Sequence, residues 1–219
     1  MDEYLNNKNI VIVGPSNTLE NKHIGFEIDK FDIVIRINSY HNLSKKDYGN
    51  KVNIIYHSFY NYIPTITKDT KFIKSTYPIY SKNKRGNFIP KNNNRLLFNK
   101  SKNKINKHIQ HLRYDFDKYN NCFNLGNLKK TRPSSGITTI YDILSYINII
   151  KNITIYGINF GLTNINSQYK VDKNPPHNLN EDLFRFIKIL KNLNQNQFKK
   201  IIIKDPKLKQ YIYNHLNFS

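Results

Sequence analysis

The chain has 219 residues, enough for one compact α/β domain with a buried core, and it carries a formal net charge of +20. A single cysteine, Cys122, excludes an intrachain disulfide and favours a reducing compartment. The N-terminus is acidic and polar before a short apolar run, which is typical of neither a signal peptide nor a spanning helix of about 20 apolar residues, so we expect a cytoplasmic protein.

The first half of the chain contains predicted strands separated by turns and one short helix. The continuous apolar run at 9–13 is typical of a strand buried on both faces, and it ends in the turn Gly14-Pro15-Ser16-Asn17. A short helix with Gly25 inside it follows. Further strands are predicted at 32–37, 51–56 and 71–76, and the first of these delivers Asn38 at its C-terminal end.

Residues 81–108 are basic and contain no acidic residue. We interpret them as a solvated, mobile loop, and the alternative is contact with nucleic acid or an anionic membrane. The following segment, 105–119, is predicted to be helical and contains Asp115-Phe116-Asp117. Such a DxD pattern chelates a divalent metal in many nucleotide-sugar transferases. Because alternate residues of a helix point apart, we interpret it instead as a solvated, charge-paired face.

The second half alternates helices and strands more clearly. Pro133 to Gly136 forms a turn before a buried helix that starts near Ile137. A strand at 152–156, a polar loop at 161–176, an amphipathic helix at 181–193, a strand at 199–203 and a helix at 206–216 follow. This order predicts a single α/β nucleotide-binding domain over 1–219, with a mostly parallel sheet flanked by helices and room for a small lid.

Three turns should meet at one edge of this sheet, because ligands of open parallel sheets bind outside the carboxyl ends of the strands. They are Gly14 to Asn17, Arg36 to Asn38, and Pro133 to Gly136. Gly14 would let the backbone approach a ligand, with Pro15, Ser16 and Asn17 beside it. Ser134, Ser135 and Gly136 stand at a helix N-terminus, where N–H groups form an anion site. Together these turns suit a nucleotide, and the alternative is an ordinary turn and helix cap.

His177 follows a Pro-Pro loop and precedes a predicted helix that contains Glu181 and Asp182. An imidazole has a pKa near neutrality, so His177 is a candidate general base, the alternative being a surface or capping histidine. GxGxxG and GxxxxGK[ST] patterns are absent, which disfavours dinucleotide oxidoreductases and P-loop enzymes. The spacings CxxC and HExxH, typical of metal sites, are absent as well.

Three motifs resemble those of the sialyltransferase superfamily and occur in its order. The segment IVGPSNTLENKHIGFEIDKFDIVIRIN resembles the large sialylmotif, in which a glycine turn follows a buried strand, and its second part contains Gly25, Ile28-Asp29, Val34, Arg36 and Asn38. RPSSGITTIYDILSYINIIKNITIYGINF resembles the small sialylmotif, and His177 to Asp182 resembles the very small motif, His-x4-Glu. The chain is also similar here to bacterial lipooligosaccharide sialyltransferases, in which an aspartate can hold the acidic place.

The resemblance implies a GT-A-like variant of the α/β fold and a metal-independent, inverting transfer of sialic acid, or a related sugar, from a CMP-activated donor to a glycan hydroxyl. It makes His177 the base, with Asp182 or Glu181 orienting His177 or the helix start. It also implies that Ser134, Ser135, the Gly136 amide and Tyr169 stabilise the departing phosphate, with Tyr156 a poorer match for the tyrosine.

The chain departs from animal-type members at several points. It cannot form their disulfide and shows no membrane anchor. Pro15 follows Gly14 where the family usually has an asparagine, so a different nucleotide-sugar donor is one alternative, and Ser16 or Asn17 can take the asparagine's place. The other alternative is a non-enzymatic basic module that binds nucleic acid or membrane. The expected partners are CMP-sialic acid, a glycan acceptor and, peripherally, an anionic membrane.

Overall fold

The computed structural model describes residues 1–58, 64–76, 80–82, 88–90, 109–110, 133–168 and 178–216. Its main sheet has seven parallel strands in the order β7-β4-β3-β2-β1-β8-β9. These strands are β1 (Asn9–Val13), β2 (Ile33–Ile37), β3 (Ile54–His57), β4 (Phe72–Ser75), β7 (Ile109–Gln110), β8 (Asn152–Tyr156) and β9 (Ile201–Ile203). The fold is therefore the α/β fold with a parallel sheet that the sequence predicted.

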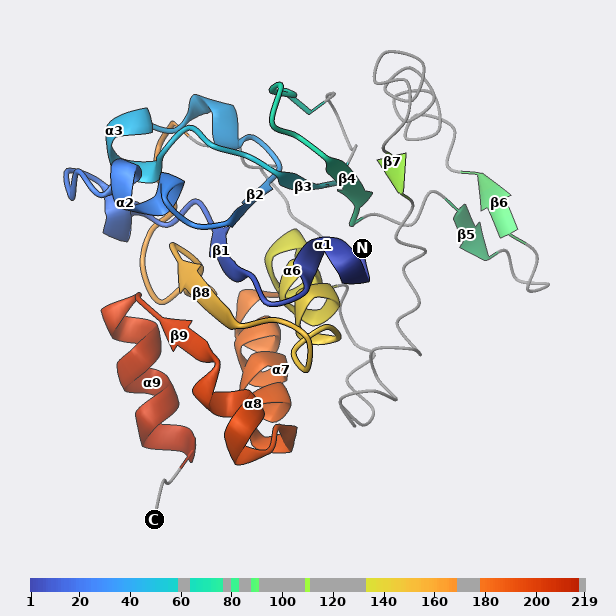
Figure 1. Ribbon diagram of the computed structural model, residues 1–219. Helices are drawn as coiled ribbons and strands as arrows, with labels where there is room; N and C mark the ends of the chain where they lie inside the picture. The colour runs from blue at the N-terminus through green and yellow to red at the C-terminus, as the bar shows by residue number, and fades with distance from the viewer. Residues whose placement is uncertain are drawn as a thin grey trace.

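Helices cover the sheet and close its ends (Figure 1). The α-helices described are α1 (Asp2–Leu5), α2 (Gly25–Asp29), α3 (Lys45–Tyr48), α6 (Ser135–Leu144), α7 (Leu179–Asn192), α8 (Gln195–Lys199) and α9 (Pro206–Leu216). In Figure 1, α2 and α3 lie at one end of the molecule, and α7, α8 and α9 gather at the other. No helix in the described part of the chain is long and apolar enough to cross a membrane.

The strand order reverses beside β1. After β1 the chain builds β2, β3 and β4 on one side, and it later returns to place β8 and β9 on the other side. Such a switch point opens a crevice at the carboxyl ends of the strands, where open α/β sheets bind their ligands. The turn after β1 and the turn after β8 stand at this point.

Alternating side chains of the strands enter two hydrophobic clusters, one on each face of the sheet. Ile10 and Ile12 of β1 belong to the larger cluster, which includes residues of α6, α7 and α9. Val11 and Val13 belong to the smaller one, together with Ile28 of α2 and Tyr48 of α3. Burial on both faces is why the central strands read as unbroken apolar runs in the sequence.

The predicted strands at 9–13 and 152–156 and the helix at 206–216 are confirmed with the same bounds. The predicted helix at 105–119 is wrong at Ile109 and Gln110, which form β7 and pair with Ile73 and Lys74 of β4. Sequence periodicity could not show this, because an open sheet edge offers backbone partners that a local pattern does not contain. The Asp115 and Asp117 pair lies outside the described residues.

The basic segment 81–108 is described only in part. Ser81 and Lys82 belong to β5 (Tyr80–Lys82), which pairs antiparallel with β6 (Phe88–Pro90). The remainder of the segment lies outside the described residues.

Asp29 and Arg36, which belong to the stretch that resembles the large sialylmotif, form a structural clamp in which Arg36 is buried and Asp29 is partly exposed. The Asp29 carboxylate accepts hydrogen bonds from the N–H groups of Asn50 and Lys51 at 2.8–3.0 Å and pairs with Arg36 at 3.5 Å. Arg36 is 1% exposed, and its guanidinium donates to the carbonyls of Tyr48 and Lys51. Burial lowers the pKa of Arg36 to about 10, and Asp29 opposes that shift. These two motif residues therefore hold the chain between α3 and β3.

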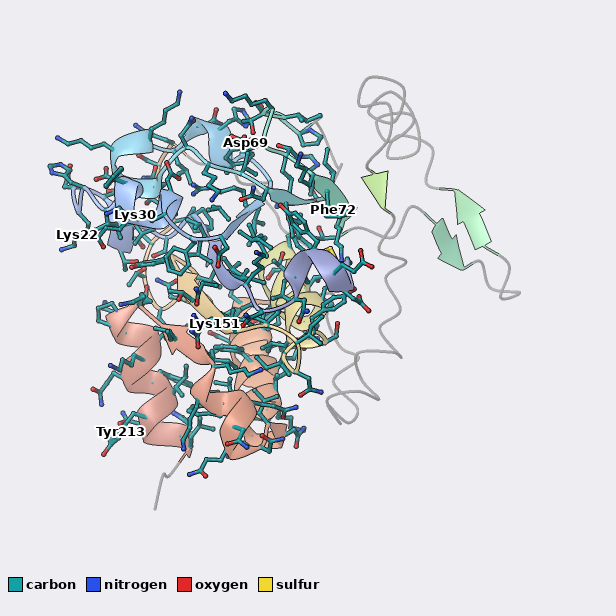
Figure 2. All side chains as sticks on the ribbon, in the orientation of Figure 1. Lys22, Lys30, Asp69, Phe72, Lys151 and Tyr213 are labelled. Carbon is teal, nitrogen blue, oxygen red and sulfur yellow. The ribbon has the colours of Figure 1, made fainter. Side chains whose placement is uncertain are left out.

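Polar side chains of β4 attach it to α6. Lys74, which is 2% exposed, pairs with the buried carboxylate of Asp142 in α6, and Tyr56 of β3 donates to the same carboxylate at 2.5 Å. Phe72, which Figure 2 labels, lies at the other end of β4. Its ring is edge-on to that of Tyr4 in α1, with ring centroids 5.1 Å apart. The position of α6 under the sheet is thus fixed by a buried ion pair as well as by apolar packing.

Candidate active site

The N-terminus of α6 lies at the carboxyl edge of the sheet. Its N-cap is Ser134, whose Oγ accepts from the N–H of Ile137 at 3.4 Å and whose carbonyl accepts from Thr138 at 3.1 Å. The N–H of Ser134 itself donates to Asp182. Among the described residues, the N–H groups of Ser135 and Gly136 have no acceptor. Two donors at the positive end of a helix dipole therefore remain for an anion.

The packing around position 136 does not require a glycine there. A Cβ at this position would meet Ser134 Oγ at 3.5 Å and Ile158 Cγ2 at 3.8 Å, which are ordinary contacts. A glycine within a helix costs about 0.5–1 kcal/mol relative to alanine. The missing side chain leaves room beside the two donors, as a site that receives a phosphate needs.

The Ser135 side chain reaches the end of β4. Its Oγ lies 2.7 Å from Oγ1 of Thr76, which is 2% exposed, and the N–H of Thr76 donates to the carbonyl of His57 at 2.9 Å. Sequence reasoning missed Thr76. The signal available was a hydroxyl at the last position of the predicted strand 71–76, at the edge where ligands bind.

Asp182 connects α7 to the start of α6. Its carboxylate is 0% exposed, accepts the Ser134 N–H at 2.9 Å, and pairs with Arg185 at 2.7 Å. Glu181 pairs with the same guanidinium at 3.2 Å. Burial raises the pKa of Asp182, and the hydrogen bonds from Ser134 and Arg185 oppose the rise. Among the described residues, the carboxylate of Asp182 therefore contacts the start of α6 and not the start of its own helix. The orienting roles predicted for Asp182 and Glu181, toward His177 or the start of their own helix, remain predictions.

His177 and Tyr169 lie outside the described residues. The residue after His177, Asn178, is the N-cap of α7, and its Oδ1 accepts from the N–H groups of Asn180 and Glu181 at 2.9 and 3.4 Å. Asn178 therefore fills the capping role that was one of the two alternative explanations for His177, and the other, an ordinary surface histidine, stays open. The role of His177 as a base remains a prediction.

The turn after β1 packs against the turn after β8. A Cβ on Gly14 would lie 2.4 Å from the carbonyl oxygen of Gly157, so the close backbone approach that requires glycine here is to Gly157. The N–H of Ser16 donates to the same carbonyl at 2.9 Å. The Ser16 Oγ is 2.8 Å from Asn159 Nδ2 and 2.9 Å from Thr163 Oγ1, inside a buried network. The Ser16 side chain is thus engaged within the protein.

The remaining predicted residues differ in their surroundings. Asn38 adopts a φ of +47°, and its Oδ1 accepts from the N–H of Ser58 at 2.8 Å, which fixes the turn after β2 at the ligand edge. Pro15 and Asn17 are partly exposed on the turn after β1. Tyr156 packs in the smaller hydrophobic cluster and is 9% exposed, so core packing accounts for it. Nucleotide contacts by these four residues remain predictions.

Comparison with known proteins identifies the family of the chain and structures that share its fold. The family model for glycosyltransferase family 29 (sialyltransferase) matches residues 5–195. No curated protein sequence matches the chain at a significant level.

Two solved structures share the fold. A mammalian sialyltransferase in complex with Gal-beta-1-3GalNAc-ortho-nitrophenol has a TM-score of 0.55 at 15% identity, over 90% of this chain and 69% of its own. The sialyltransferase CstII from Campylobacter jejuni, in complex with cytidine-5'-monophosphate, has a TM-score of 0.54 at 17% identity, over 95% of this chain and 84% of its own. At these identities the likeness concerns the fold.

Proposed function

The chain belongs to glycosyltransferase family 29, the sialyltransferases, and we propose that it transfers sialic acid, or a closely related sugar, from a CMP-activated donor to a glycan hydroxyl. The observation that carries the proposal is the start of α6. There, the backbone N–H groups of Ser135 and Gly136 lie at the carboxyl edge of the sheet, where they can donate hydrogen bonds, and the absence of a side chain on Gly136 leaves space beside them.

The donor phosphate would bind at these two amides, with the hydroxyls of Ser134 and Ser135 beside them. Negative charge grows on the phosphate as the bond to the sugar breaks. Preorganised N–H donors and a helix dipole stabilise such charge without reorganisation. The Thr76 contact holds the Ser135 hydroxyl at this edge.

The acceptor would be activated by His177. As the acceptor oxygen attacks the anomeric carbon, its proton passes to the imidazole, the bond from that carbon to the phosphate oxygen breaks, and CMP departs. A single displacement of this kind inverts the anomeric configuration. His177 directly precedes the N-cap of α7, and α7 is tied to α6 by Asp182, so the segment that carries the base is linked to the phosphate site.

We further propose that the reaction needs no metal cofactor. CMP is a stabilised leaving anion, and the start of α6 provides the donors to receive its charge. Transfer should then persist at full rate after exhaustive treatment with EDTA. A rate restored only by added Mg²⁺ or Mn²⁺ would contradict this part of the proposal.

A thermal-shift screen of CMP, UDP and GDP tests the donor class. A ligand that binds only the native state at a hundredfold excess over Kd stabilises it by about 2.7 kcal/mol. We expect a shift with CMP alone, followed by transfer from CMP-sialic acid to a glycan. A shift selective for UDP or GDP would instead favour the same fold with another donor, for which Pro15 in the first turn is the specific indication.

A further inference from the structure

The end of the molecule formed by α7 from Leu183 onward, α8, β9 and α9 is strongly basic. Residues 183–216, which the structure describes throughout, contain eight basic residues and one acidic residue. The acid, Asp205, is 2% exposed and is hydrogen-bonded to Thr18 and Leu208. The one arginine, Arg185, is buried in its ion pairs. The exposed charged side chains in this range are therefore all lysines, namely Lys191, Lys199, Lys204, Lys207 and Lys209.

A general bias toward lysine does not explain this imbalance. Residues 1–76 contain ten basic and eight acidic residues, so lysines there are nearly matched by acids. On α2, for example, Glu27 is exposed within one turn of Lys30. Figure 2 shows Lys22 and Lys30 at the opposite end of the molecule from Tyr213. Acidic residues are missing from the exposed surface at the C-terminal end, and a bias toward lysine alone would not remove them.

Apolar side chains stand exposed beside these lysines. Tyr213 is 68% exposed and follows Lys209 by four residues on α9, so the two share a helix face. Ile202 of the edge strand β9 is 39% exposed, and Lys204 lies two residues further on, on the same side. Lysine with adjacent exposed apolar side chains is the combination found on proteins that bind at membrane interfaces.

We propose that this basic end of the molecule, which carries the five exposed lysines as well as Ile202 and Tyr213, docks on an anionic phospholipid membrane. Lysines are point charges that respond to the diffuse negative potential of a lipid surface. Arginine, the usual reader of nucleic-acid bases and phosphates, does not reach the described surface in this range. The proposal does not depend on which sugar nucleotide is the donor.

Vesicle co-sedimentation of the full chain tests the proposal. Wild type should bind phosphatidylcholine vesicles that contain phosphatidylserine and not vesicles of phosphatidylcholine alone. The triple variant Lys204→Gln, Lys207→Gln, Lys209→Gln should bind about a hundredfold more weakly, since each lysine near such a surface contributes about 1 kcal/mol. The matched control, Lys22→Gln, Lys45→Gln, Lys46→Gln, removes three exposed lysines at the other end and should bind like wild type.

Both variants should retain the wild-type melting temperature and activity toward a soluble acceptor, because none of these lysines belongs to the active site. Equal loss of binding in the two triples would overturn the assignment of the surface. Loss of binding only when the lysines and arginines of 81–108 are neutralised would move the contact to that segment and overturn it too. Tighter binding to duplex DNA than to the anionic vesicles, at equal salt, would overturn the choice of partner.

Discussion

The Oδ2 atom of Asp182 accepts a hydrogen bond from the backbone N–H of Ser134 at 2.9 Å, across 48 residues of sequence. This contact joins the first turn of α7 to the N-cap of α6. The other oxygen of the carboxylate pairs with Arg185, which is fully buried. One carboxylate therefore links the segment that follows His177 to the proposed phosphate site.

Replacing Asp182 should destabilise the protein far more than replacing Glu181. Asp182→Asn removes the closer of two negative charges from a buried guanidinium, a change that typically costs about 3–5 kcal/mol. Glu181→Gln acts on the same arginine but from a side chain that is 26% exposed, so we expect a loss of about 1 kcal/mol or less. Urea denaturation of both variants measures the difference. Similar losses of unfolding free energy in the two variants would show that the contacts of Asp182 with Ser134 and Arg185 contribute no more to stability than the contact of Glu181 does.

Two glycines should respond in opposite ways to alanine. Gly136→Ala meets only ordinary contacts and should raise stability by about 0.5–1 kcal/mol, while weakening CMP binding because the methyl group enters the proposed phosphate site. Gly14→Ala would place its Cβ 2.4 Å from the Gly157 carbonyl oxygen and should destabilise by about 1–3 kcal/mol or more. Thermal denaturation and CMP titration separate the two effects. Unchanged CMP affinity in Gly136→Ala would place the phosphate elsewhere.

His177→Ala should lower kcat by about 10²–10⁴-fold while leaving CMP affinity intact, because a general base acts in the chemical step. Its neighbour provides the control. Asn178→Ala removes the N-cap of α7 and should cost about 0.5–2 kcal/mol of stability, with kcat of the folded protein retained. Steady-state kinetics at saturating donor distinguishes the two variants. Near-normal turnover of His177→Ala would remove it from the mechanism.

His57 should make the protein less stable in mild acid. It is 0% exposed at the end of β3, and burial, followed by the nearby charge of His41, lowers its pKa from 6.5 to about 3. Between those two pKa values, His57 binds a proton in the unfolded chain but not in the folded protein. The contribution of His57 to the free energy of unfolding is therefore complete above pH 6.5 and falls as the pH drops toward 3. The slope from this one group is about 1.4 kcal/mol per pH unit.

Unfolding free energies of wild type and His57→Gln, measured across that pH window, isolate this contribution. The variant should lose less stability per pH unit than wild type. Parallel pH profiles would mean that His57 takes up its proton in the folded protein as well.

Much of the fold could be predicted from local pattern. The runs at 9–13 and 152–156 fill central strands that are buried on both faces, and such runs carry a strong signal. Ile109 and Gln110 carried none, because their strand exists only through pairing with β4. The same distinction holds in the site. The start of α6 could be predicted from Pro133 to Gly136, whereas Thr76 could not be assigned to it without knowing that β4 ends beside Ser135.

The sequence by itself determined the central strands at 9–13 and 152–156, the helix at 206–216, the turns at the carboxyl edge and the family motifs, because these depend on residues close together in the chain. The tertiary structure decided which polar groups are occupied within the protein. Ser16 and Gly14 are engaged with the β8 turn, Arg36 with Asp29, and Asp182 with Ser134. Arg36 and Asp29 are near neighbours in the chain, but the Asp182 and Ser134 contact spans 48 residues and the Ser16 and Asn159 contact spans 143. A buried polar group must find a partner wherever the fold brings one.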